Sequence, residues 1–334
     1  MKILVVHTYG LGDMIMFTPA LQEIVVSYPN AVIDFVVFQK LAAEPIKKFP
    51  NLGKLYFSTF KMSSVMNVLK ELRGVKYDIA LTTSGTAPIK AALFLHFCRT
   101  KVRIGEFKSS WQKLFFDKPV EYEEYLHRVE NNFKLIDALT LHKKRLPVSY
   151  YGIDSSVRYA KHNRQKLVVG VHAGSNPKFS FKRWKPDYFV ELIELLKQNF
   201  IIDVKVFSGP GEIKESRFIA ERINGEIVER ESLYETAKEI ATCDLFIHTD
   251  SGLGHIASCF DLEIFTIFGP AKDYKAHPWS QNTHVVKLNL PCQPCYGTDR
   301  LKRCTDFKCL NDLTPEKVFE EIREKSKVLC NAVR

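Results

Sequence analysis

A short segment near residue 250 combines the residue types that hold a charged ligand. An apolar run beginning at Leu245 stops at Asp250, and Ser251, Gly252 and His255 follow before the pattern becomes helical. In an open α/β sheet such a segment forms a strand, a tight loop and the start of a helix, where backbone N–H groups face an anion. Asp250 and His255 add polar side chains that can orient the ligand.

A similar junction near residue 174 is suited to a phosphate group. An apolar strand ends before Gly174 and Ser175, and Lys178, Lys182 and Trp184 follow. The small residues let a phosphate approach the backbone, while one ammonium group neutralises its charge. Trp184 should anchor the chain beside Lys182, which favours this lysine over Lys178. The alternative for both lysines is an ordinary place on the surface.

Two further junctions each present one carboxylate. Glu212 follows a strand that ends at Phe207, and it either hydrogen-bonds a ribose hydroxyl or only begins a charged helix. Asp13 follows Gly10 and Gly12, and it is either a helix cap or a general base that takes a proton from an attacking hydroxyl. The glycine expected three residues after Gly12 is missing, which argues against a nicotinamide dehydrogenase.

Half of the eight cysteines lie close together in the sequence, with the spacing C-x2-C-x8-C-x4-C. In a reducing compartment, such a cluster is more typical of a tetrahedral thiolate site than of two disulfides. Zinc is the expected metal and iron is the alternative, and with no open coordination position the metal would be structural. The expected ligands are Cys292, Cys295, Cys304 and Cys309.

Composition and charge narrow the class of protein. The chain is 46% hydrophobic and 26% charged, as is usual for globular proteins, and its apolar runs are too short to span a bilayer. We therefore expect a cytoplasmic protein. Residues 1–150 carry a net charge of +8 out of +10, so this half should face an anionic acceptor or the inner face of the cytoplasmic membrane. Its candidate acceptor-binding residues are Arg99, Lys101 and Arg103, and no nucleic-acid motif accompanies them.

The chain alternates strand-length apolar runs with helical periodicity, which predicts an α/β fold with mostly parallel sheets. The alternation is interrupted at residues 147–166 by a polar, basic stretch that we interpret as a linker. Near the C-terminus, residues 315–329 form one amphipathic helix with Thr314 as its expected cap. Two domains joined by a linker follow from this pattern.

These segments together resemble the lipopolysaccharide heptosyltransferases of glycosyltransferase family 9. The resemblance covers the whole chain, and its combination of motifs is specific although each piece alone is weak. The matching stretches are Ile-Leu-Val-Val near the start, Gly-Leu-Gly-Asp13, Thr-Pro-Ala-Leu21, His172-Ala-Gly-Ser, Lys182-Arg-Trp184, Asp250-Ser-Gly-Leu-Gly-His255 and Phe268-Gly-Pro270.

The resemblance implies a GT-B architecture, in which two Rossmann-like domains face each other. Residues 1–155 would form the acceptor-side domain with the general base, and residues 166–312 the nucleotide-sugar domain with a Cys-rich excursion at 291–310. Residues 313–334 would form a helical segment that crosses back to the first domain.

The resemblance also implies an inverting transfer of a heptose from ADP-heptose to a lipopolysaccharide or lipooligosaccharide core acceptor. Asp13 corresponds to the general base, and Lys182 would stabilise the leaving diphosphate without a catalytic metal. An insertion at residues 177–181 leaves the choice between Lys178 and Lys182 open. The donor-binding positions are Gly174, Ser175, Lys182, Glu212, Asp250, Ser251, Gly252 and His255.

The sequence leaves two alternative functions open. A member of the same family could glycosylate a protein, in which case the site is similar and only the acceptor differs. A non-catalytic subunit could bind a nucleotide sugar, but such a subunit has no use for a base at Asp13.

Overall fold

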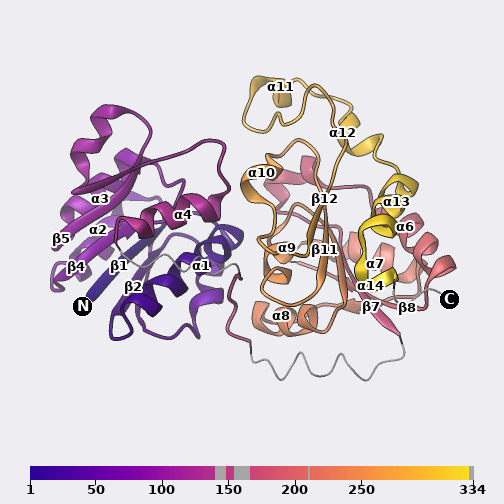
Figure 1. The fold of residues 1–334 in the computed structure, drawn as a ribbon, viewed down its shortest axis with the longest axis horizontal. Helices are drawn as coiled ribbons and strands as arrows, with labels where there is room; N and C mark the ends of the chain where they lie inside the picture. The colour runs from indigo at the N-terminus through magenta and orange to yellow at the C-terminus, as the bar shows by residue number, and fades with distance from the viewer. Residues whose placement is uncertain (140–147, 154–165, 210, 331–334) are drawn as a thin grey trace. The chain divides into compact units, whose positions relative to one another are not determined.

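The computed structural model describes residues 1–139, 148–153, 166–209 and 211–330, and it divides into two compact units, Met1–Gly152 and Ile153–Arg334 (Figure 1). Most of the predicted linker at 147–166, together with the predicted domain boundary at residue 155, lies outside the described residues. Within the described residues, no helix is long and apolar enough to span a membrane.

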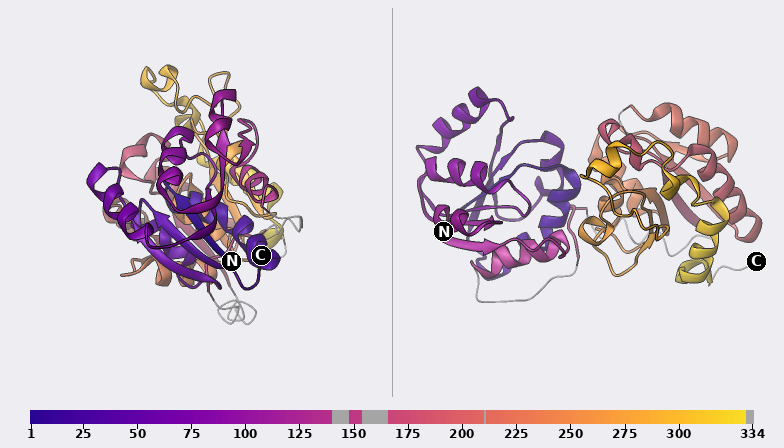
Figure 2. Two further views of the ribbon diagram at one scale, coloured as in Figure 1. Left: turned by 90° about the vertical axis from the view of Figure 1, so that its left-hand side faces the viewer. Right: turned by 90° about the horizontal axis from the view of Figure 1, so that it is seen from above.

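Unit 1 is built on a six-stranded sheet in which all neighbouring strands are parallel, in the order β3-β2-β1-β4-β5-β6. The central strands are buried almost along their full length, because helices cover both faces of such a sheet (Figure 2). The strands are β1 (Lys2–His7), β2 (Val32–Val37), β3 (Leu52–Phe57), β4 (Tyr77–Thr82), β5 (Thr100–Phe107) and β6 (Lys118–Glu121).

The helices of unit 1 connect these strands. Helix α1 packs against both α4 and η1, while α3 packs against β5 and η2. Their bounds are α1 (Leu11–Ser27), η1 (Lys40–Ile46), α2 (Met62–Leu72), α3 (Pro88–Phe97), η2 (Ser110–Phe115) and α4 (Arg128–Asp137).

Unit 2 repeats the same topology. Its strands are again parallel and follow the order β12-β11-β10-β7-β8-β9, which matches unit 1 when each unit is counted from its own first strand. This is the strand order of Rossmann folds. The strands are β7 (Leu167–His172), β8 (Ile202–Phe207), β9 (Glu226–Val228), β10 (Leu245–Thr249), β11 (Glu263–Ile267) and β12 (Thr283–Val286). Two Rossmann-like domains with parallel sheets, as predicted, are confirmed.

Helices also cover the sheet of unit 2. Trp184 is fully buried and donates a hydrogen bond from Nε1 to the carbonyl of Leu313 at 2.8 Å, so the indole does anchor the segment that carries Lys182. The bounds are η3 (Pro177–Lys182), α6 (Pro186–Asn199), α7 (Ile213–Arg222), α8 (Leu233–Ala241), α9 (Gly252–Ala257), α10 (Asp273–Ala276), α11 (Asp299–Lys302), α12 (Lys308–Asn311), α13 (Pro315–Lys325) and α14 (Lys327–Cys330).

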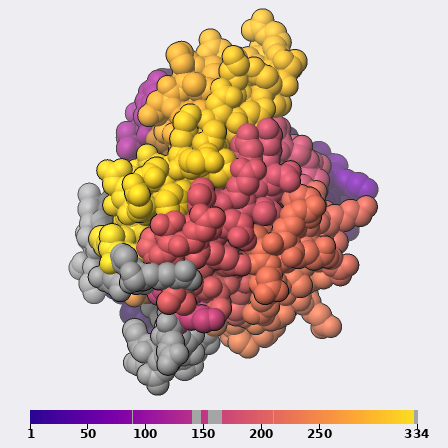
Figure 3. Space-filling view, turned by 90° about the vertical axis from the view of Figure 1, so that its right-hand side faces the viewer, coloured from indigo at the N-terminus to yellow at the C-terminus, as the bar shows by residue number. Residues whose placement is uncertain are grey.

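The C-terminal helices pack within unit 2. Helix α13 contacts α6 and β12, and Figure 3 shows this segment in yellow beside the pink helices of the same unit. At the start of α14, the Lys327 N–H donates to Glu263 Oε1 at 2.8 Å and ties the helix to β11. The return of residues 313–334 to the first domain stays a prediction, and residues 331–334 lie outside the described part.

Candidate functional site

Each unit has its own group of candidate functional residues at the place where the strand order reverses. We call each group a half-site: that of unit 1 surrounds Asp13, and that of unit 2 surrounds Lys182 and Glu212. In open parallel sheets, ligands bind at the carboxyl ends of the strands beside this switch point. The order reverses between β1 and β4 in unit 1 and between β7 and β10 in unit 2. The loop after β1 leads to Asp13, the loop after β7 holds Gly174 and Ser175, and the loop after β10 holds Asp250 and Ser251.

In unit 1, Asp13 lies on the first turn of α1 and is paired with an arginine from α4. Gly10 is the N-cap of α1, and no side chain caps this helix, so Asp13 is not the helix cap. One of its carboxylate oxygens, Oδ1, lies 3.1 Å from Arg128 Nη1, and the side chains of Asp13 and Arg128 are 26% and 20% exposed. The carboxylate is therefore fixed in direction and still accessible, as a general base must be.

Arg128 is a member of this half-site that sequence reasoning missed. Its guanidinium carbon lies 5.1 Å from the centre of the Tyr9 ring, and Nη1 donates to the carbonyl of Ser84 at 3.2 Å. Glu106 lies close by, where Oε2 accepts from the Gly85 N–H at 2.7 Å, and burial raises the pKa of this carboxyl. These residues come from the loops after β1 and β4, from β5 and from α4, so only the fold brings them to Asp13.

His7, at the end of β1, supports the loop in its neutral form. Its ring accepts at Nδ1 from the Thr83 hydroxyl at 2.9 Å, while Nε2 donates to the Gly10 carbonyl at 3.2 Å. Burial lowers the pKa of His7, although the nearby Asp13 acts in the opposite direction. His7 thus fixes the backbone that leads into α1.

The predicted acceptor-binding cations lie away from Asp13. Arg99, Lys101 and Arg103 are at the amino end of β5, whereas Asp13 lies at the carboxyl edge of the same parallel sheet. Lys101 pairs with Asp78 at 2.7 Å, and Arg103 donates to both carboxylate oxygens of Asp117. Neighbouring carboxylates thus neutralise two of the three, and the structure does not bring this group to the candidate base.

In unit 2, the predicted pair of Lys182 and Asp250 is assembled. Lys182 Nζ lies 2.6 Å from Asp250 Oδ2, and both side chains are less than 20% exposed. The ammonium group also faces the rings of Phe179, at 5.3 Å, and Tyr296, at 5.1 Å. By contrast, Lys178 is exposed and makes no ion pair within the described residues. The geometry favours Lys182 as the cation of this half-site.

Glu212 is held by a buried hydrogen-bonded network rather than by a helix start alone. Its Oε2 lies 2.9 Å from His172 Nε2 and accepts from the Gly209 N–H at 3.0 Å, while Arg183 lies 3.6 Å from Oε1. Burial opposes ionisation, but the hydrogen bond and charge of His172, the Gly209 N–H and Arg183 outweigh it, and the pKa of Glu212 lies below its ordinary value. The other ring nitrogen of His172 lies 3.0 Å from Ser251 Oγ.

His172 therefore joins two of the predicted donor positions, Glu212 and Ser251. The resemblance includes His172 as the first residue of a motif, but sequence reasoning gave it no role. Its position as the last residue of β7, next to the switch point, was the available signal.

Gly174 is required where it stands. A Cβ atom at this position would lie 2.1 Å from the Glu212 carboxylate, so a larger residue would displace that side chain. Ser175 is buried, and its carbonyl accepts from Arg183 Nη2 at 2.5 Å. Of the predicted donor positions, Gly174, Ser175, Glu212, Asp250 and Ser251 are thus connected through one set of contacts.

Gly252 and His255 lie on the short helix α9, directly after this network. His255 is 6% exposed, which makes it about as buried as Glu212. Beneath α9, His248 is fully buried, donates from Nδ1 to the Thr249 carbonyl at 2.5 Å and accepts at Nε2 from Thr266. Burial lowers the pKa of His248 to about 3, so it is neutral and structural.

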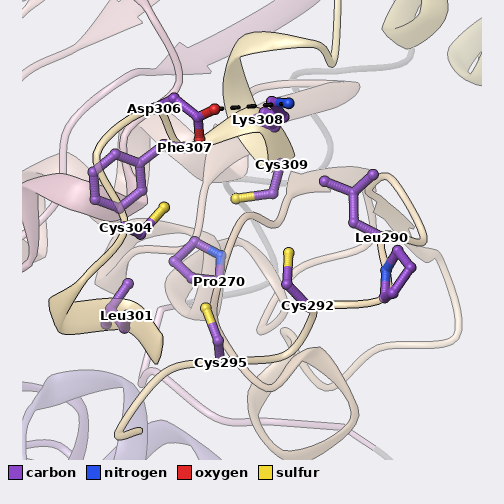
Figure 4. Close-up of a pocket in the computed structure, with 11 residues that line it drawn as sticks. Pro270, Leu290, Cys292, Cys295, Leu301, Cys304, Asp306, Phe307, Lys308 and Cys309 are labelled. Atoms are coloured by element: carbon purple, nitrogen blue, oxygen red, sulfur yellow. Dashed lines mark ion pairs between the residues drawn. The ribbon is translucent and has the colours of Figure 1, made fainter. Parts of the chain in front are cut away.

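The four cysteines predicted as metal ligands line a single cavity of about 290 Å³ in unit 2. Figure 4 shows their sulfur atoms directed toward the same space, with Pro270, Leu301 and Phe307 around them. Burial, together with the charge of the neighbouring thiols, raises the pKa of Cys309 to about 11. The thiols are close enough to affect one another's ionisation.

Within the described residues, no three His, Cys, Asp or Glu side chains are already gathered as a metal-binding group. The residue types and their common cavity fit a tetrahedral thiolate site, in which each sulfur would lie about 2.3 Å from the ion. The Cys-rich segment also contributes to the half-site, because Tyr296 stacks on Phe181 of η3 with ring centres 5.8 Å apart.

Comparison with known proteins shows which family the chain is similar to. The model of glycosyltransferase family 9 (heptosyltransferase) matches residues 65–305. A curated relative, lipooligosaccharide heptosyltransferase 2 of Campylobacter jejuni, is 29% identical and covers 98% of this chain and 99% of its own length.

Solved structures show the same fold. The heptosyltransferase WaaC of E. coli with ADP has a TM-score of 0.75 at 21% identity, covering 98% of this chain and 100% of its own. The iron-containing dodecameric heptosyltransferase TibC, in complex with ADP-D-β-D-heptose, has a TM-score of 0.57 at 14% identity. It covers 98% of this chain and 77% of its own.

Proposed function

This chain belongs to glycosyltransferase family 9 (heptosyltransferase), and we propose that it transfers a heptose from ADP-heptose to a lipopolysaccharide or lipooligosaccharide core acceptor. It is therefore an enzyme, a glycosyltransferase. The curated relatives are named as heptosyltransferases of these two glycolipids, which supports the proposed acceptor.

The half-site of unit 2 carries the proposal, because the Lys182–Asp250 pair and the contacts of His172 with Glu212 and Ser251 both lie at the strand switch point. An ADP-sugar presents a diphosphate and a ribose with two hydroxyl groups. Lys182 supplies the charge for the diphosphate, and the ionised Glu212 accepts hydrogen bonds from ribose hydroxyls. The neighbour WaaC was solved with ADP, which supports this choice of nucleotide.

The proposed reaction is a single displacement with inversion. The oxygen of an acceptor hydroxyl attacks the anomeric carbon of the heptose, and the bond from that carbon to the diphosphate oxygen breaks. Asp13 takes the hydroxyl proton as the new glycosidic bond forms, and ADP leaves with the bonding electrons. Lys182 stabilises the charge that develops on the diphosphate, so the step needs no catalytic metal.

Arg128 has two uses in this scheme. Its ion pair fixes one oxygen of Asp13, which orients the carboxylate toward the incoming hydroxyl. Its charge, between Tyr9 and Asp13, is also suited to an acidic group of the acceptor. Arg128 therefore replaces Arg99, Lys101 and Arg103 as the cation that we propose next to the reacting acceptor.

We further propose peripheral contact with an anionic membrane surface, because such acceptors are membrane glycolipids. Residues 1–150 carry most of the excess positive charge of the chain, and basic segments are attracted to anionic lipid.

A structural metal at the Cys-rich segment is part of the proposal. Cys292, Cys295, Cys304 and Cys309 would hold zinc or iron, and the ion would cross-link residues 292–309 to one another. The four thiols would lose their protons on binding, and the ion would offset part of the negative charge of the resulting thiolates. The iron-containing neighbour TibC supports iron as the alternative to zinc.

The decisive experiment incubates the purified chain with ADP-heptose and a deacylated core acceptor and detects the product by mass spectrometry. UDP-glucose and ADP-glucose serve as donor controls. We expect a mass increase of one heptose with ADP-heptose alone. Transfer from another donor, or to protein instead of the saccharide, would overturn the proposal.

A further inference from the structure

A second cavity, of about 530 Å³, lies entirely within unit 1 and is lined mainly by apolar side chains. Most of them come from helices α2 and α3 and from Phe38 and Phe60, which follow β2 and β3. Figure 1 shows α2 and α3 in purple within this unit. A cavity of this size holds a drug-sized apolar ligand.

The rim of the cavity exposes large apolar side chains to solvent. Met62 is 74% exposed, Phe60 65%, Phe97 55% and Leu93 54%. All four line the cavity, so they form one contiguous apolar surface rather than scattered residues. A contiguous exposed apolar surface of this kind marks a binding site.

The uncharged polar side chains of the lining are confined to one place. Thr8, Tyr9 and Thr86 come from the loops after β1 and β4, which flank the switch point, and Thr8 Oγ1 donates to Thr86 Oγ1 at 3.3 Å. Tyr9 also lies under Arg128, the partner of Asp13. Tyr9 thus both lines the cavity and contacts the arginine that pairs with Asp13, so the cavity adjoins the half-site of unit 1.

The charge at this cavity is positive. Lys90 lines the cavity. In the sequence, Lys61 stands between Phe60 and Met62, the two most exposed of the four rim residues. Both lysines are exposed, and neither makes an ion pair within the described residues. An occupant with an anionic group next to an apolar chain would match both features.

We infer that this cavity binds one acyl chain of a glycolipid acceptor while the sugar of that acceptor lies at Asp13. The inference rests on the proposed function, and it narrows the acceptor to an acylated, anionic glycolipid. The chain would lie between α2 and α3, and Tyr9 would mark the passage from the acyl chain to the sugar. A flat bilayer surface could cover the exposed rim but would leave the cavity empty.

The test compares two acceptors that share one saccharide, one deacylated and one carrying a single short acyl chain that remains monomeric. We expect the KM of the acylated acceptor to be at least tenfold lower, because each buried methylene contributes about fourfold to binding. In the double variant Phe60→Ser/Met62→Ser, this ratio of the two KM values should fall below about twofold.

A matched control is Leu41→Ser, since Leu41 is 57% exposed in the same unit but does not line the cavity. This control should keep the tenfold ratio. Equal KM values for the two acceptors in the unmodified chain would overturn the inference while leaving the proposed function intact. The inference also fails if Phe60→Ser/Met62→Ser only weakens binding to anionic vesicles and keeps the ratio, because the rim would then dock on a bilayer.

A second measurement does not depend on turnover. Decyl phosphate, below its aggregation concentration, should bind the unmodified chain in calorimetry and bind Phe60→Ser/Met62→Ser at least fivefold more weakly. If no acceptor receives heptose, the proposed function fails, and this measurement alone decides the inference. Equal binding of decyl phosphate to both chains would refute it.

Discussion

Lys182 Nζ lies 2.6 Å from Asp250 Oδ2, and this pair connects the loop after β7 with the loop after β10 across the strand switch point of unit 2. The pair keeps the ammonium group in place in the absence of a ligand. In the proposed function, the diphosphate of the donor would compete with Asp250 for this ammonium group. Donor affinity would then depend on the difference between two charge-assisted hydrogen bonds rather than on one alone.

The first prediction concerns which lysine meets the diphosphate. Lys182→Met should raise the Kd for ADP by about 10- to 100-fold, because a hydrogen bond to a charged group contributes about 1.5–3 kcal/mol. Lys178→Met is the matched control and should change Kd less than twofold, since Lys178 is exposed. Isothermal titration calorimetry gives both values. A larger effect at Lys178 would reverse the assignment.

The second prediction concerns Asp13. Asp13→Asn keeps the size of the side chain but cannot take a proton, so kcat should fall by about 10²- to 10⁴-fold. The Kd for ADP should stay within twofold, because Asp13 belongs to unit 1 and the donor positions belong to unit 2. Single-turnover kinetics and calorimetry separate the two effects. Near-normal turnover in Asp13→Asn would remove Asp13 as the base.

The fold could be predicted well from the sequence, because each buried strand leaves a pattern within a short stretch of residues and this pattern recurs along the chain. Buried parallel strands such as Lys2–His7 and Leu245–Thr249 form apolar runs, and a glycine follows three residues after each strand ends. The strands with the weakest apolar pattern are short and lie at the edges of the two sheets. They are β6, β9 and β12.

The candidate site was predicted only in part, because several of its contacts join distant segments. Arg128 reaches Asp13 from α4, and Tyr296 reaches Lys182 from the Cys-rich segment. Neither residue belongs to a motif at a strand end. The group of cations that includes Arg103 was predicted but lies away from the candidate base. A cluster of positive charge in the sequence does not show that its members lie at the amino end of β5 and pair with carboxylates.

The third prediction is a pH dependence of stability that comes from Glu212. The pKa of this carboxyl in the folded chain lies below the ordinary value of 4.5, so its ionised form contributes stability above pH 4.5. That contribution is lost as the pH falls through the folded pKa. Glu212→Gln should therefore lower Tm by about 3–6 °C at pH 7, and the difference should shrink below pH 4.5.

Thermal melts of both chains between pH 7 and pH 3.5 test this dependence. Glu221→Gln is a suitable control, because Glu221 is exposed and lies on α7, the helix that follows Glu212. It should shift Tm by less than 1 °C. A difference between the unmodified chain and Glu212→Gln that stays constant with pH would contradict the assignment.

The fourth prediction concerns the metal. Purified chain should contain about one equivalent of zinc or iron, and Cys295→Ser should lose it, because three thiolates bind such an ion more weakly than four. Cys330→Ser should keep the full equivalent, since Cys330 is exposed and does not line the cysteine cavity. Elemental analysis measures both variants. Less than a tenth of an equivalent in the unmodified chain would reject the site.

The fifth prediction links the Cys-rich segment to donor binding through Tyr296. Its ring faces the ammonium of Lys182 at 5.1 Å and stacks on Phe181 of η3, so it restricts where Lys182 can point. Tyr296→Ala should raise the Kd for ADP by about 3- to 20-fold, because a cation–π contact contributes about 0.5–2 kcal/mol.

The reason for the loss in Tyr296→Ala can be checked with a second substitution. Tyr296→Phe retains the ring and should bind ADP within twofold of the unmodified chain. In the background of Lys182→Met, the change Tyr296→Ala should have little further effect, since the tyrosine acts through the lysine. Independent, additive losses in the double variant Lys182→Met/Tyr296→Ala would show that Tyr296 touches the donor directly. Tyr296 would then be a binding residue rather than a positioning residue.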